Sequence, residues 1–168
     1  MEGDVAGWLF DLLLTEPAVD PLAVHGQARV VGGGDRDKYD IAVGPVVETA
    51  KRPAVRAEAV VEMKVFPRIG FGTDQHSVHY TQLLGDVARL GTLGAVVPVC
   101  AVVVIDGCRY LQGKPLGVQR HERLVVTRNE EAPGTHIFVL SLVEGVWQTM
   151  YDAPRCAGGG MLPLTKSS

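Results

Sequence analysis

The sequence predicts a soluble, mixed α/β single domain, and three observations lead to this fold class. Short stretches with alternating apolar residues, typical of strands, precede and follow a longer stretch with helical periodicity at 73–90. A nearly continuous apolar and largely β-branched run at 95–105 is typical of a strand buried on both faces. The chain has 168 residues, of which 46% are hydrophobic, so it has the size and composition of one domain with its own core.

The N-terminal part is predicted to form a helix and then a hairpin. Residues 5–14 carry an apolar face at helical spacing, and prolines that follow end the helix. Strands are expected at 27–31 and 39–43, joined by the turn signal of three glycines and an aspartate at 32–35. The next segment, 44–56, is expected to be a loop or an irregular hairpin arm.

The middle of the chain is predicted to form a strand, a helix and a second strand. Valines alternate with other residues over 57–66, and a proline and glycines follow. The helix at 73–90 has an apolar stripe and a polar stripe, the latter including Asp86 and Arg89. Its length allows the strands before and after it, at 57–66 and 95–105, to be parallel neighbours in one sheet.

The C-terminal third is predicted to be β-rich. Asp106-Gly107 is a tight-turn signal. Residues 122–127, 135–142 and 145–151 alternate like strands. We therefore expect a single domain at 1–156, with a core at about 2–105 and a small β addition at about 106–152, and a flexible tail at 157–168.

Composition and charge narrow the function classes. The formal net charge of −3 argues against a protein with a basic surface throughout, although local basic patches remain compatible with it. Three widely spaced cysteines without a CxxC pair predict neither a disulfide framework nor a structural zinc site. The first residues are apolar and acidic, unlike a secretory signal, and the apolar run is too short to span a bilayer. The expected location is the cytoplasm, with no membrane partner.

Two charged residues interrupt the apolar strand at 57–66. Glu62 and Lys64 are two residues apart, so both side chains leave the same face of the strand. Burying them is costly unless each is paired or bound to something. Asp40 interrupts the neighbouring strand in the same way, and pairing of the two strands would bring it to Glu62. Two such carboxylates can share a magnesium ion, which takes oxygen ligands.

This pattern resembles the signature of the PD-(D/E)XK, or restriction-endonuclease-like, nuclease superfamily. The signature is an acidic residue on one strand and Glu-x-Lys on the next, here Tyr39-Asp40 and Glu62-Met63-Lys64. The proline that usually precedes the aspartate is replaced by Tyr39. The resemblance covers about the first two-thirds of the chain. It implies a restriction-endonuclease-like core of the order α-β-β-β-α-β around a mixed central sheet.

The resemblance also implies an activity and roles for individual residues. It implies a nuclease that hydrolyses phosphodiester bonds of DNA, or less often RNA, with Mg²⁺ (or Mn²⁺) as cofactor. Asp40, Glu62 and the Met63 carbonyl would hold the metal, and Lys64 would orient or deprotonate the attacking water or neutralise charge on the phosphate. Gln75 is a further catalytic candidate.

Other features that the resemblance implies concern the first helix, the second helix and assembly. The family often places a glutamate on its first helix, for which Glu2 is the nearest match and Asp11 the other option. Some branches carry a glutamine and a tyrosine on the helix after Glu-x-Lys, and here Gln75 and Tyr80 are one residue further apart than in that pattern. Many members are dimers, so the resemblance implies a homodimer, with the segment after Asp106 as its contact surface.

Two other functions are compatible with the sequence. The first is a catalytically inactive protein of the nuclease fold that acts as a nucleic-acid-binding or assembly subunit. The second is a small ligand-binding or structural α/β protein in which Glu62 and Lys64 form an exposed pair on a solvated strand face.

Overall fold

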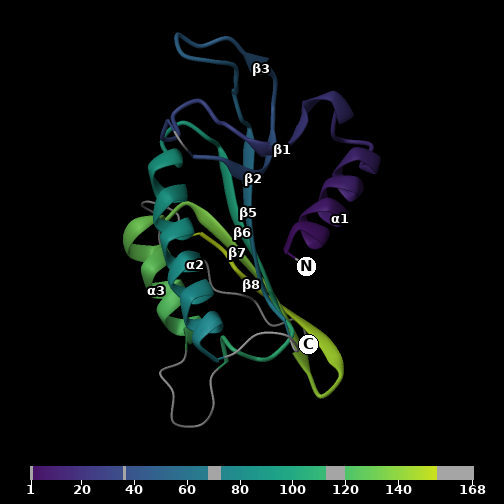
Figure 1. The fold of residues 1–168 in the computed structure, drawn as a ribbon, viewed down its shortest axis with the longest axis vertical. Coiled ribbons are helices and arrows are strands. Elements are labelled where there is room, and N and C mark those ends of the chain that lie inside the picture. The colour runs from purple at the N-terminus through teal and green to yellow at the C-terminus, as the bar shows by residue number, and fades with distance from the viewer. Residues whose placement is uncertain (1, 36, 68–72, 113–119, 155–168) are drawn as a thin grey trace, which may run out of the picture.

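The structure, a computed structural model, describes residues 2–35, 37–67, 73–112 and 120–154. A six-stranded sheet lies between α1 on one face and α2 and α3 on the other (Figure 1). The helices have the following bounds: α1 Glu2–Thr15, η1 Pro21–Ala23, α2 Thr73–Leu93 and α3 Arg120–Glu131. The strands have the following bounds: β1 Val24–Ala28, β2 Tyr39–Val43, β3 Val46–Val47, β4 Ala54–Val55, β5 Ala59–Phe66, β6 Val99–Asp106, β7 Thr135–Val143 and β8 Val146–Asp152.

The sheet is mixed, with the strand order β1-β2-β5-β6-β7-β8. β1, β2 and β5 form an antiparallel meander, β5, β6 and β7 are parallel, and β8 returns antiparallel to β7. The parallel crossover through α2 was expected from the length of the segment between β5 and β6. The prediction of a mixed α/β protein is therefore confirmed.

The main core lies between the sheet and the layer of α2 and α3. Leu83, Val87 and Leu90 of α2, which recur at helical spacing, are fully buried against the strands. Gly91 allows α3 to approach α2, because a side-chain carbon at this position would meet the Glu131 carbonyl oxygen at 2.0 Å. The face of the sheet that lines the candidate site is thus covered by a well-packed helix.

The predicted strand at 122–127 is wrong, because these residues belong to α3. Leu124 and Arg128, four residues apart, are its buried residues, as on one face of a helix. The other two predicted strands of this region are confirmed as β7 and β8. The C-terminal part is therefore a helix and two strands that continue the central sheet, rather than a purely β addition.

Smaller differences concern the first hairpin. The strand expected at 27–31 forms earlier, as β1, and ends near Gln27, whose φ of 49° lies in the left-handed region. The segment expected to be a loop or an irregular hairpin arm contains the short hairpin of β3 and β4. The expected flexible tail at 157–168 lies outside the described residues. No helix in the described ranges is long and apolar enough to cross a membrane.

Candidate functional site

β5 directs Glu62 and Lys64 to the same face of the sheet, toward α2, because alternate residues of a strand share a face. Both charged residues are buried there, with Glu62 4% and Lys64 8% exposed. The alternative of an exposed pair on a solvated strand is therefore wrong. Charged groups buried to this extent need partners, and the partners come from the helix.

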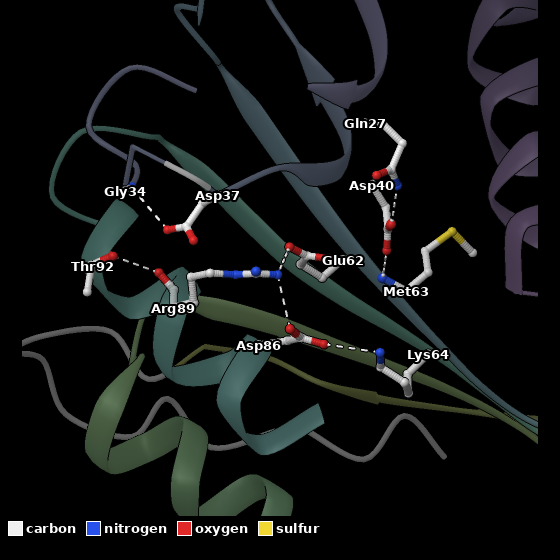
Figure 2. Close-up of polar contacts among 10 residues, drawn as sticks. All are labelled: Gln27, Gly34, Asp37, Asp40, Glu62, Met63, Lys64, Asp86, Arg89 and Thr92. Atoms are coloured by element: carbon white, nitrogen blue, oxygen red, sulfur yellow. Dashed lines mark hydrogen bonds and ion pairs between the residues drawn. The ribbon is translucent and has the colours of Figure 1, made fainter. Parts of the chain in front are cut away.

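Asp86 and Arg89 of α2 pair with the two charged residues of β5 (Figure 2). The Arg89 Nη2 donates to Glu62 Oε1 and, at 3.0 Å, to Asp86 Oδ1. The Lys64 Nζ lies 3.4 Å from Asp86 Oδ2. The four side chains form a chain of alternating charge, in which Asp86 connects the two cations.

Asp40 approaches the same part of β5 from β2. The two strands pair from Val43–Ala59 to Ile41–Val61, and Asp40 is the next residue along β2. Its Oδ2 accepts the Met63 main-chain N–H at 2.8 Å, and its Oδ1 accepts Gln27 Nε2 from β1 at the same distance. The main-chain group of Met63 that the structure places at Asp40 is thus the N–H, whereas the sequence interpretation used the carbonyl as a metal ligand.

Glu62 is in an unfavourable environment for an ionised carboxylate. The pKa of its carboxyl group is raised to about 8, mainly by burial; Arg89 opposes this shift, and the charges of Asp40 and Asp86 contribute to it. The Asp40 carboxyl group is thus among the smaller causes that raise the pKa of Glu62, and its own hydrogen-bond donors are Gln27 and the Met63 N–H. Asp40 and Glu62 lie next to paired positions of β2 and β5, and their sharing of one metal ion stays a prediction. A cation bound to Glu62 would favour its ionised form.

The charges of the cluster are compatible with one more cation. Glu62 and Asp86 pair with Arg89 and Lys64, and the Asp40 carboxylate, whose donors Gln27 and the Met63 N–H are neutral, adds a negative charge on the neighbouring strand. Among the residues that the structure describes, no group of three or more His, Cys, Asp or Glu is arranged to hold a metal ion. Magnesium commonly uses one or two carboxylates and completes its shell with water and substrate oxygens, so the pair of Asp40 and Glu62 fits that ion.

Gln75, Tyr80 and Asp11 belong to other parts of the two helices α1 and α2. Gln75 is exposed and precedes Asp86 by about three turns of α2, roughly 16 Å along the helix axis. Tyr80 is buried and donates to the Arg120 main-chain carbonyl at 2.8 Å, which is a structural contact between α2 and the start of α3. Asp11 is exposed on α1, and the side chain of Glu2 lies outside the described part of the chain.

Sequence reasoning gave no role to Asp86 and Arg89, although both lie on the polar stripe predicted for the second helix. The signal that could have found them is their spacing. They are opposite charges three residues apart, and so share one helix face, on a helix that must cover a strand carrying an acid and a base. Without the packing of α2 on β5, that face could equally have been solvated.

Comparison with protein-family models, with curated proteins and with solved structures found no significant match to this chain. Its function therefore has to be argued from the site itself.

Proposed function

We propose that this protein is a metal-dependent nuclease that hydrolyses phosphodiester bonds of DNA, with RNA as the less favoured substrate. The observation that carries this proposal is the burial of Glu62 and Lys64 on one face of β5, with the Asp40 carboxylate of the paired strand β2 bound to the Met63 N–H between them. Two acids and a lysine gathered at the end of a strand pair are the groups that phosphodiester hydrolysis with a divalent cation requires.

The order of elements supports placing the chain in the PD-(D/E)XK superfamily as part of the same proposal. α1, β1, β2, β5, α2 and β6 follow one another as the helices and strands of the restriction-endonuclease-like core do, with β3 and β4 as an insertion. The two described cysteines, Cys100 and Cys108, are free thiols, which suits a protein of the reducing cytoplasm.

Each residue of the cluster has a distinct role in the proposed reaction. Asp40 and Glu62 would hold Mg²⁺ (or Mn²⁺), which supplies a polarised phosphoryl oxygen and an activated water. Lys64 leaves the same face of β5 as Glu62, and its ammonium group, paired with Asp86, would orient the water by a hydrogen bond or neutralise charge on the phosphate. Asp86 fixes the Lys64 ammonium group from the helix side, which limits the positions that it can take.

A second candidate function is a nucleic-acid-binding or assembly subunit that has kept the fold and lost the activity. The observation that favours it is that the charged groups already neutralise one another, Glu62 with Arg89 and Lys64 with Asp86. Such a network can be a structural feature without any ligand.

An assay of nucleic-acid cleavage separates the two candidates. Plasmid, linear, branched and single-stranded DNA and an RNA are incubated with the protein and Mg²⁺ or Mn²⁺, with EDTA as control. Glu62→Gln and Lys64→Met should each lower the cleavage rate at least 100-fold, roughly 2.7 kcal/mol of activation free energy. The matched controls Glu58→Gln and Lys51→Met change exposed residues of the same types and should stay within twofold of wild type.

Metal-dependent cleavage that depends on Glu62 and Lys64 would support the nuclease. A folded wild-type protein that binds DNA and cleaves none of these substrates would favour the binding subunit. Cleavage that survives both site substitutions would show that the proposed residues do not carry the activity.

A further inference from the structure

Arg89 lies on the carboxylate that the proposed function assigns to the metal. Its Nη2 donates to Glu62 Oε1, and the Glu62 side chain is almost completely enclosed. In an enclosed site, two cations that bind the same carboxylate interact strongly, because little water screens their repulsion. A metal ion and the guanidinium group therefore compete for Glu62.

The surroundings of Arg89 provide it with other partners. The same Nη2 donates to Asp86 Oδ1 at 3.0 Å, one helical turn earlier on α2. The Arg89 Cζ also lies 5.1 Å from the centre of the Tyr39 ring, within the range of a cation–π contact. A guanidinium group that leaves Glu62 would keep both contacts, so its departure does not leave a buried charge unpaired.

We propose that Arg89 acts as an internal competitor of the metal ion at Glu62, and that α2 thereby lowers the metal affinity of the site. This inference rests on the proposed function. In the protein without metal, Arg89 neutralises Glu62. When Mg²⁺ or Mn²⁺ binds, Arg89 moves to its contacts with Asp86 and Tyr39.

The consequence is that the chain sets its own threshold for metal loading. The helix supplies the competing cation, and β5 and β2 supply the carboxylates, so any movement of α2 relative to the sheet changes the affinity for metal. The metal concentration needed to load the site is set by the charge of Arg89 and not by the size of its side chain. A lysine at this position should retain it, whereas neutral side chains of similar length should not.

Titration with Mn²⁺ alone tests this inference without measuring catalysis. Binding is followed by the paramagnetic resonance signal of unbound Mn²⁺ and by calorimetry, in wild type, Arg89→Met, Arg89→Gln and Arg89→Lys. Both neutral variants should bind Mn²⁺ at least tenfold more tightly than wild type, about 1.4 kcal/mol. The lysine variant should stay within threefold of wild type. Circular dichroism checks that each variant folds. If one of the two neutral variants does not fold, the other still tests the inference.

The same Mn²⁺ titration of Glu62→Gln, alone and combined with Arg89→Met, shows whether the measured binding takes place at this site. Neutral variants that bind no more tightly than wild type, while Glu62→Gln weakens wild-type binding, would overturn the role of Arg89 and leave the proposed metal site intact. Binding that Glu62→Gln leaves unchanged in both backgrounds would instead overturn the metal site itself, and the competition with it.

Discussion

Glu62 and Asp106 are buried carboxylates on neighbouring parallel strands, and they are satisfied in different ways. Asp106, which ends β6 and is 0% exposed, accepts the main-chain N–H groups of Tyr110 at 2.7 Å and Leu111 at 2.8 Å. Glu62 accepts the guanidinium group of Arg89, from a side chain with several rotatable bonds.

The difference separates a structural acid from a candidate for chemistry. Main-chain donors are fixed by the path of the backbone, so Asp106 shapes the turn that follows β6, where the Cys108 thiol is a further donor at 3.7 Å. The donor of Glu62 can move away and leave the carboxylate to a ligand. Burial of an acid does not by itself indicate a functional site, and the kind of donor that satisfies it is more informative.

The largest effect that would test this comparison is on stability. Asp106→Asn places an amide opposite two buried main-chain N–H groups, so we expect the free energy of unfolding to fall by about 2–4 kcal/mol. Glu62→Gln replaces a carboxyl group whose ionised form is already disfavoured by burial and leaves Arg89 with Asp86, so its cost should stay below about 1 kcal/mol. Urea denaturation of both variants in metal-free buffer measures the two values. If both variants lose the same free energy of unfolding, Glu62 and Asp106 contribute equally to stability, and the comparison fails.

An intermediate effect is expected at Asp40, which has one main-chain donor and one side-chain donor. Gln27→Ala removes the hydrogen bond from Gln27 Nε2 and should lower the free energy of unfolding by about 1 kcal/mol. Gln27→Gly removes the same hydrogen bond but suits the positive φ of this residue, so it should cost less than alanine. Urea denaturation compares the two variants with wild type. An alanine variant as stable as wild type would show that the side-chain donor contributes nothing at Asp40.

The smallest effect concerns the thiol next to Asp106. The pKa of Cys108 is raised to about 11, mainly by burial and in smaller part by the charge of Asp106. Only the thiolate reacts, so alkylation of Cys108 should be slow at pH 8 and should rise about tenfold per pH unit up to pH 10. Mass spectrometry of the Cys108 peptide after iodoacetamide treatment measures the rate. A rate that levels off near pH 9, as for an ordinary thiol, would contradict the influence of the buried acid.

The parts of the structure that follow from local pattern were predictable. The period of two along 57–66 placed Glu62 and Lys64 on one face, and the alternation at 39–43 gave the bounds of β2. Local pattern failed at 122–127, where an alternation like that of the other strands suggested a strand. The packing of Leu124 and Arg128 on a common face instead stabilises a helix.

The contribution of α2 to the site could not be predicted for a related reason. Its helical period showed which residues are polar, but not which strand the polar stripe covers. Asp86 and Arg89 reach Lys64 and Glu62 because α2 crosses β5 at that point, which is a property of the assembled layers. Periodicity describes one element at a time, whereas a site made by two elements depends on how they pack.

The hydrogen bond from the Met63 N–H to Asp40 has a consequence for experimental design. At this position a side-chain carboxylate, and not a main-chain carbonyl, joins β2 to β5, so the residue that would bind metal also holds two strands together. A substitution of Asp40 that abolishes activity therefore cannot separate lost chemistry from a local opening of the sheet. The side chains of Glu62 and Lys64 point away from the contact between β2 and β5. Substitutions of these two residues therefore separate lost activity from lost structure better, and an inactive allele of this protein should carry them.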